Sequence, residues 1–309
     1  MLTLRAESTI GFNLIEQHFE SPYDSSTLLP LVRLPLCATL QVTRRCNLRC
    51  IYCSEDSMIR EPTSEFLHFL IDRLDGLDRV IIAGGEPTLR QDLPELARRL
   101  SKRVKITAMA SNSVLVSESL AKELKPSLSY VDVTIDGTRE THNKIRGEYD
   151  KVLAGVRNFV AAGVDVSLVT VLLMDNVADI LHVCNLADEL HAKKLKILTP
   201  IRKGRGEKIV SRALGPPELN RLYNLVKDEK QKAGWRERIT ITDWGMVDEG
   251  HALLVHPDGD VVASPVPSNP GCIRNVGNLK EDDMESIWND YPYKENHLRK
   301  YLEETLYVC

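Results

Sequence analysis

Long apolar runs are absent from this 309-residue chain, and so is a large excess of either charge. Without about 20 consecutive apolar residues it predicts no membrane-spanning helix. With a formal net charge of −4 it shows no basic footprint, so we expect no nucleic-acid partner. The N-terminus has no basic-then-apolar signal pattern and the chain has no low-complexity segment. Together these absences predict a cytoplasmic globular protein that does not bind membranes.

Cysteine is sparse and unevenly placed. The chain has seven, an odd number, which suits free thiols or metal ligands rather than a disulfide framework. Three of them, Cys46, Cys50 and Cys53, lie within eight residues. Cys37 and Cys184 are isolated in apolar segments, where we expect them to pack as small hydrophobic residues. The cluster of three therefore carries the chemical information.

The middle of the chain alternates between short apolar runs and helical patterns. The predicted strands are 38–42, 79–83, 104–110, 130–135, 165–172 and 194–198. The predicted helices are near 64–77, 91–101, 117–124, 151–162 and 178–191. Such alternation is typical of right-handed βαβ units in a parallel sheet. Six repeats favour an α/β fold of the partial (β/α)6, TIM-like barrel type, although a doubly wound sheet would give the same pattern.

Changes in composition divide the chain into three parts. Residues 1–36 form an N-terminal extension and residues 37–206 the barrel. Residues 207–309 form a small α+β cap, in which we expect a helix after Gly215, a hairpin turning at 257–260 and a helix near 294–305.

The spacing CxxxCxxC follows the first predicted strand, at the end of a barrel where active-site loops lie. Three thiolates ligate three irons of a cubane and leave the fourth iron open. A small molecule with an amine and a carboxylate can chelate that iron, and S-adenosylmethionine (SAM) is such a molecule. The alternative is a zinc site, which usually takes a fourth Cys or His at short spacing, and none follows closely.

At these residues the sequence resembles the radical SAM superfamily. The resemblance implies one [4Fe–4S] cluster on Cys46, Cys50 and Cys53, reduced by flavodoxin or ferredoxin, and reductive cleavage of SAM to a 5′-deoxyadenosyl radical. It implies that Tyr52 packs near the SAM adenine. It also implies that the segment Gly84, Gly85, Glu86 and Pro87 binds SAM, with the Glu86 carboxylate taking the amino group.

Polar residues after the next two strands also resemble SAM contacts of this superfamily. Ser111 and Asn112 match its polar pair, and Thr134 and Asp136 match a segment that ends further on at Arg146. The resemblance implies contacts to the SAM ribose and carboxylate. Each residue taken alone is equally compatible with a helix cap or a turn.

The segment 255–288 resembles the start of SPASM or twitch domains, which follow the barrel in many radical SAM enzymes. Where those domains place a cluster-ligating cysteine, this chain has Ser264, and only Cys272 and Cys309 remain beyond the barrel. We therefore expect a degenerate domain that covers the barrel mouth without an auxiliary cluster. Cys272, after a Pro-Gly turn, is a candidate hydrogen-atom donor to a substrate radical, the alternative being a packed loop thiol.

The resemblance predicts hydrogen abstraction from a peptide or small-molecule substrate. We expect modification of a peptide or protein, by a maturase or an epimerase. One alternative is a small-molecule enzyme, such as a sugar epimerase, dehydratase, decarboxylase or tetrapyrrole-maturation enzyme. The other is a non-catalytic iron–sulfur or zinc scaffold.

Overall fold

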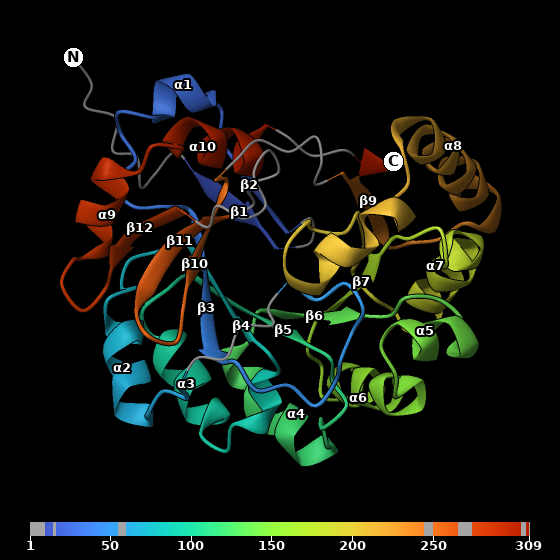
Figure 1. Ribbon diagram of the computed structural model, residues 1–309, viewed down its shortest axis with the longest axis horizontal. Coiled ribbons are helices and arrows are strands. Elements are labelled where there is room, and N and C mark those ends of the chain that lie inside the picture. Colours follow the sequence, from blue (N-terminus) through green and yellow to red (C-terminus); the bar gives the residue numbers. More distant parts are fainter. Residues whose placement is uncertain are drawn as a thin grey trace.

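The chain folds around a single large sheet. The computed structural model describes residues 10–14, 17–54, 60–243, 250–264, 274–303 and 307–308. Eleven strands lie in the order β12-β11-β10-β3-β4-β5-β6-β7-β8-β9-β13 (Figure 1). Among these described residues, no helix is long and apolar enough to cross a membrane.

The centre of the sheet is the predicted run of six parallel strands. Their bounds are β3 Cys37–Thr43, β4 Arg79–Gly84, β5 Ile106–Ser111, β6 Tyr130–Thr134, β7 Val166–Val171 and β8 Lys194–Leu198. Strand β9 (Arg238–Thr242), which sequence reasoning missed, pairs in parallel with β8. From β3 to β9 consecutive strands are neighbours without a reversal of order, which favours the partial barrel over a doubly wound sheet. The α/β barrel prediction is confirmed.

Helices cover the outer face of this sheet and follow one another around it (Figure 1). Their bounds are α2 Ser64–Asp72, α3 Leu93–Leu100, α4 Glu118–Leu124, α5 Arg139–Ile145, α6 Tyr149–Ala161, α7 Ile180–Glu189 and α8 Pro216–Ala233. Short 3-10 turns are η2 Pro87–Leu89, η3 Lys125–Ser127, η4 Val177–Asp179 and η5 Gly204–Arg212. Thr63 and Ser117 cap α2 and α4 by accepting backbone N–H bonds. The main core lies between sheet and helices.

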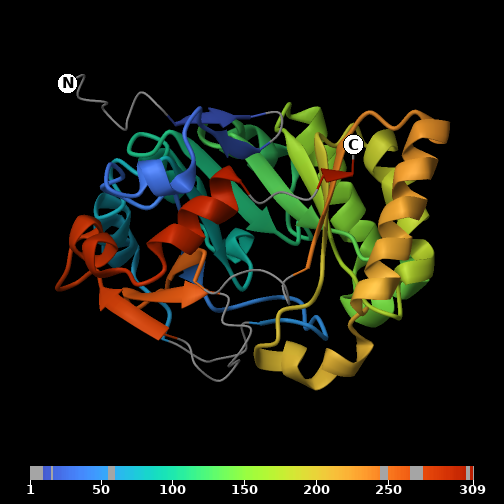
Figure 2. The same ribbon diagram turned by 90° about the horizontal axis from the view of Figure 1, so that it is seen from above.

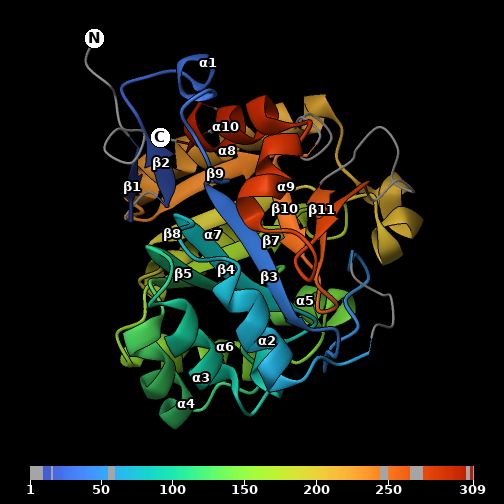
Figure 3. The same cartoon turned by 90° about the vertical axis from the view of Figure 1, so that its left-hand side faces the viewer.

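Elements from the N-terminal and C-terminal parts of the chain pack together where the barrel strands begin. The hairpin β1 (Gly11–Asn13) and β2 (His18–Glu20), helix α1 (Ser25–Leu28) and helix α10 (Lys294–Leu302) lie together there (Figures 1 and 3). Their shared core includes Phe19, Leu28 and Leu298, packed with Leu36 and Cys37 at the start of β3. These elements form a floor at the end of the barrel opposite the cysteine loop.

The C-terminal part extends both edges of the sheet. Its further elements are β10 Ala252–Val255, β11 Asp260–Ser264, β12 Arg274–Asn278, α9 Met284–Asp290 and β13 Tyr307–Val308. Strand β10 pairs in parallel with β3, and the expected hairpin joins it to β11. Strand β13 pairs with β9, beside α8 (Figure 2). We expected this part to cover the barrel mouth, whereas α10 packs at the floor. Cys272 and Cys309 lie outside the described residues, and the division at residues 36 and 206 stays a prediction.

Candidate functional site

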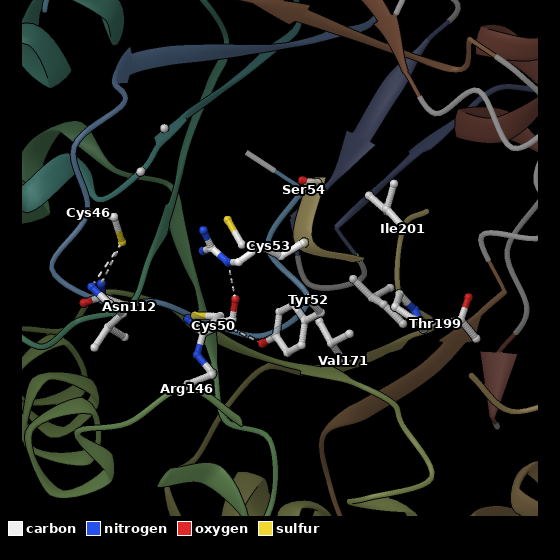
Figure 4. Close-up of a pocket in the computed structure, with 16 residues that line it drawn as sticks. Cys46, Cys50, Tyr52, Cys53, Ser54, Asn112, Arg146, Val171, Thr199 and Ile201 are labelled. Carbon is white, nitrogen blue, oxygen red and sulfur yellow. Dashed lines mark hydrogen bonds between the residues drawn. The ribbon is translucent and has the colours of Figure 1, made fainter. Parts of the chain in front are cut away.

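The three clustered cysteines line one pocket at the ends of the barrel strands where the loops emerge. The pocket has a volume of about 270 Å³ and is also lined by Tyr52 and Arg146. Figure 4 shows the cysteines around a common space, with Asn112 beside Cys46. Cys46 is exposed, Cys53 half-buried and Cys50 buried. The cysteine loop thus presents three sulfur ligands to a cavity that a cofactor can enter.

Two glycines allow the turn after β4 to pack against the start of the cysteine loop. The Gly85 N–H donates to the Thr43 carbonyl at 2.9 Å, and the Glu86 N–H donates to the Arg45 carbonyl at 2.8 Å. A Cβ atom on Gly84 would lie 2.2 Å from the Thr43 oxygen, and one on Gly85 would lie 2.1 Å from the Arg45 oxygen. Only glycine fits this close approach.

The Glu86 carboxylate is buried and bonded within the chain. Its Oε1 accepts hydrogen bonds from the Ser111 hydroxyl at 2.7 Å and from the Thr88 hydroxyl at 2.7 Å. Its Oε2 accepts from the Asn112 N–H at 2.6 Å. These bonds join the end of β4 to the end of β5 and cap η2, which begins at the buried Pro87. Whether the amino group of SAM adds a further bond stays a prediction.

Tyr52, Asp136 and Arg146 form a connected network beside Cys50. The Tyr52 hydroxyl donates to Asp136 Oδ2, and Arg146 Nη1 donates to the Tyr52 oxygen at 2.5 Å. Burial raises the pKa of Asp136, against the opposing effect of Arg146. Burial disfavours the Arg146 charge, but the charges of Tyr52, Cys50 and Asp136 outweigh it and raise its pKa. The network holds Tyr52, the residue before Cys53, in place. The spacing of the cysteines did not predict this network.

Two further contacts support the loop and were not assigned by sequence reasoning. His142 Nδ1 accepts from the Asp136 N–H at 3.1 Å, and burial lowers the pKa of His142 to about 4, so the ring is neutral. Arg205 Nε donates to the Cys50 carbonyl at 2.9 Å. A Cβ on Gly204 would lie 2.8 Å from the Cys53 carbonyl oxygen. The Gly-Arg-Gly sequence at residues 204–206 was the signal in the sequence for this contact with the end of the cysteine loop.

The predicted site residues fall into two groups. Those that line the pocket are Cys46, Cys50, Tyr52, Cys53, Gly84, Gly85, Asn112 and Arg146. Buried residues that are not among its lining residues are Glu86, Pro87, Ser111 and Asp136. Thr134 is half-buried at the end of β6. The structure therefore brings the cysteine loop and the ends of β4, β5 and β6 into one neighbourhood, as the parallel barrel requires.

The chemistry of the donor set fits an iron–sulfur cluster. Thiolate is the ligand that iron–sulfur clusters use, and three are available. Burial raises the pKa of the Cys46 and Cys50 thiols, so cluster assembly must release protons from them. The Asn112 amide lies 4.0 Å from the Cys46 sulfur, and the Leu48 N–H donates to that sulfur at 3.4 Å. Such polar contacts to ligating sulfur are typical of cluster sites.

A parallel barrel with a three-cysteine loop at its mouth is typical of enzymes that hold an iron–sulfur cluster in a barrel. Comparison with known proteins identifies the family. The Radical SAM superfamily profile matches residues 40–187. A mycofactocin maturase of Mycobacterium tuberculosis is 33% identical over 281 residues, 83% of this chain and 71% of that protein. The chain belongs to the radical SAM superfamily, whose members use a [4Fe–4S] cluster and SAM.

Other relatives have different names. The Fe-coproporphyrin III synthase of Methanosarcina barkeri is 34% identical over 201 residues, 62% of this chain and 50% of that protein. The chain spans 44% to 62% of the length of the first three curated relatives, which are named as Fe-coproporphyrin III, heme and pre-heme d1 synthases. The fold is similar to Streptococcus suis SuiB bound to its precursor peptide SuiA, with a TM-score of 0.71 at 15% identity, covering 87% of this chain and 68% of that one.

Proposed function

We propose that this protein cleaves SAM reductively and abstracts a hydrogen atom from a substrate C–H bond. The observation that carries the proposal is the placement of Cys46, Cys50 and Cys53 around one cavity at the loop end of a parallel barrel. A cluster held there supplies the electron for SAM cleavage. The barrel wall closes the sides of the cavity and orients what binds, because its outer face is buried under helices.

In this proposal the pocket residues hold SAM beside the cysteines. Gly84 and Gly85 line the pocket beside the cysteines, so their backbone would pass close to the amino and carboxylate groups of SAM. Asn112 and Arg146 add polar contacts, and the ring of Tyr52 offers an aromatic surface to the adenine. Glu86, Ser111 and Asp136 hold these groups in position through the bonds described above.

Peptide modification is the substrate class that we favour. The mycofactocin maturase aligns over 83% of this chain, beyond the barrel and into the C-terminal part. SuiB, which binds a precursor peptide, has the same fold. Tetrapyrrole maturation is a second candidate, because the first three curated relatives are all named for it. The role of Cys272 as hydrogen-atom donor, and the supply of electrons by flavodoxin or ferredoxin, remain parts of this proposal.

Iron analysis and SAM cleavage test the proposal together. The anaerobically reconstituted protein should hold about four irons per chain, as one cubane requires. It should convert SAM to methionine and 5′-deoxyadenosine with dithionite as reductant. The variant with Cys46, Cys50 and Cys53 all changed to alanine should lose iron, colour and SAM cleavage together. Cys184→Ala, a change of a buried thiol in α7, is the matched control and should keep all three.

The alternatives give different results in the same experiment. Bound zinc without iron, or a full cluster that never cleaves SAM, would contradict the proposal and favour a scaffold. About eight irons per chain would show an auxiliary cluster and contradict the interpretation of Ser264.

A further inference from the structure

Some side chains on the inner face of the barrel, below the cofactor pocket, are partly exposed to solvent. On β6 the outward-facing Val131 and Val133 are fully buried, whereas the inward-facing Asp132 and Thr134 keep partial exposure. On β8 the inward-facing Lys196 is likewise partly exposed between buried neighbours. Solvent therefore reaches the middle of the barrel interior at Asp132, Thr134 and Lys196, whereas Ser167 and Lys194 just below are buried against the floor.

One row of residues crosses this inner face through directly paired strands. Asp132 on β6 pairs with Ser167 on β7, which pairs with Lys194 on β8, which pairs with Arg238 on β9. Residues paired in this way stand side by side on the same face of a sheet. Lys196 lies one step nearer the pocket on the same face of β8.

Positive charge predominates among these inner side chains. Lys196 Nζ binds the Asp132 carboxylate at 2.7 and 2.9 Å. Of the four charges that act most strongly on Lys194, those of Lys196, Arg238 and Arg79 are positive and that of Asp132 is negative. Burial, and then Lys196, lower the pKa of Lys194 to about 7. A site of this composition attracts anions.

The distance from this row to the pocket follows from strand geometry. Leu198, also on the inner face of β8, lines the cofactor pocket. Lys196 lies two residues below it and Lys194 four residues below it, which is roughly 7 and 13 Å at about 3.3 Å per residue. A substrate whose C–H bond lies in the pocket can therefore reach the row with a group at that distance.

We propose that the lower barrel interior, formed by Asp132, Lys194, Lys196 and Arg238, binds an anionic group of the substrate, a carboxylate or a phosphate. The group is carried roughly 7 to 13 Å from the C–H bond that reacts. Lys196 and Arg238 supply the charge and donors, and Asp132 orients Lys196. The inference rests on the proposed function and adds the substrate class, which is an anionic molecule.

Pyridoxal 5′-phosphate is a suitable probe, because it joins an anionic group to an aldehyde that forms an imine with an uncharged lysine amine. The holoenzyme is treated with this probe, reduced with borohydride and mapped by peptide mass spectrometry. Lys194 or Lys196 should be labelled at least tenfold faster than by pyridoxal, which has no phosphate. The exposed Lys102 should show a much smaller ratio.

Two matched variants and two competitors complete the test. Arg238→Gln should reduce the ratio of labelling by pyridoxal phosphate to labelling by pyridoxal at least threefold. Arg236→Gln should leave this ratio unchanged, because Arg236 is bound to Asp188 on the outer surface. Protection by glutarate but not glutaramide at equal ionic strength would indicate a carboxylate. Protection by inorganic phosphate alone would indicate a phosphate.

The inference would be overturned if Lys194 and Lys196 were labelled no faster than Lys102. It would also be overturned if pyridoxal phosphate and pyridoxal labelled these two lysines at equal rates. The labelling needs neither a reduced cluster nor SAM cleavage. A protein that cleaves SAM but fails this test would therefore lose only the anionic-substrate assignment, and one that passes but lacks iron would lose only the proposed function.

Discussion

Glu86 illustrates how a single side chain connects several parts of the site. Its carboxylate receives donors from Ser111, Asn112 and Thr88, so the ends of β4 and β5 are joined through one anion. Hydrogen bonds to an ionised carboxylate are stronger than those between neutral groups. The residue therefore positions Asn112, which lies next to Cys46, in addition to the contact with SAM that the family resemblance implies.

Glu86→Gln should weaken SAM binding without loss of the cluster. The change removes a charge-assisted hydrogen bond to the SAM amino group, typically worth about 1.5–3 kcal/mol, or roughly 10- to 150-fold in affinity. Equilibrium binding of SAM to the reconstituted variant measures the effect, with iron content determined in parallel. Glu118→Gln, on the exposed first turn of α4, is the control. Unchanged SAM affinity in the Glu86 variant would mean that this carboxylate only shapes a turn.

At the scale of elements, the cysteine loop is held between two glycine-containing segments. The turn after β4 packs against its beginning at Thr43 and Arg45, and the segment before η5 packs against its end at Cys53. The loop thus has little room to shift between these contacts. Its geometry depends on backbone contacts as well as on the sulfur ligands.

Gly85→Ala should lower the iron content and SAM affinity while the barrel stays folded. The added Cβ would lie 2.1 Å from the Arg45 carbonyl oxygen, a backbone atom, so the cysteine loop must move. Iron per chain after reconstitution and far-UV circular dichroism measure the two effects. Gly11→Ala, whose nearest contact would be 4.0 Å away, should change neither. A Gly85 variant with full iron content would show that the loop adapts easily.

The elements that the sequence predicted are those with strong local patterns. The strands β3 to β8 alternate with amphipathic helices, and all six lie where expected within two residues at each end. Gly234 ends the helix before strand β9, but β9 was missed because it has only five residues and its pairing with β8 depends on the whole sheet. The pocket motifs were predictable from spacing. The Tyr52–Asp136–Arg146 network and the inner basic row were not, because they join residues on separate strands and loops.

At the scale of the whole molecule, the floor and the site both contain buried neutral histidines. Burial lowers the pKa of His251 and of His297 to about 3, and that of His142 to about 4. The unfolded chain binds these protons near pH 6.5, whereas the native protein does so only near pH 3 to 4. Stability is therefore complete above about pH 6.5 and is lost as the pH falls towards 4.

Acid should destabilise the protein by about 1.4 kcal/mol per pH unit for each of these histidines below pH 6.5. Urea unfolding at pH 7.5, 6.5 and 5.5 measures the slope. His297→Gln keeps an acceptor for the Leu36 N–H and should reduce the slope of unfolding free energy against pH by the contribution of one histidine. Equal unfolding free energies at pH 7.5 and 5.5 would contradict the assignment of neutral buried rings.

The pairing of β10 with β3 has a consequence for synthesis on the ribosome. Leu253 lies beside Ala38, so the first barrel strand lacks its outer neighbour until more than 200 further residues have been made. At about 5–20 residues per second this interval is roughly 10–40 s. During it the β3 edge, which is apolar and unpaired, can join other nascent chains. Chaperones that shield strand edges during synthesis should therefore raise the yield of native protein more than chaperones added after chain release.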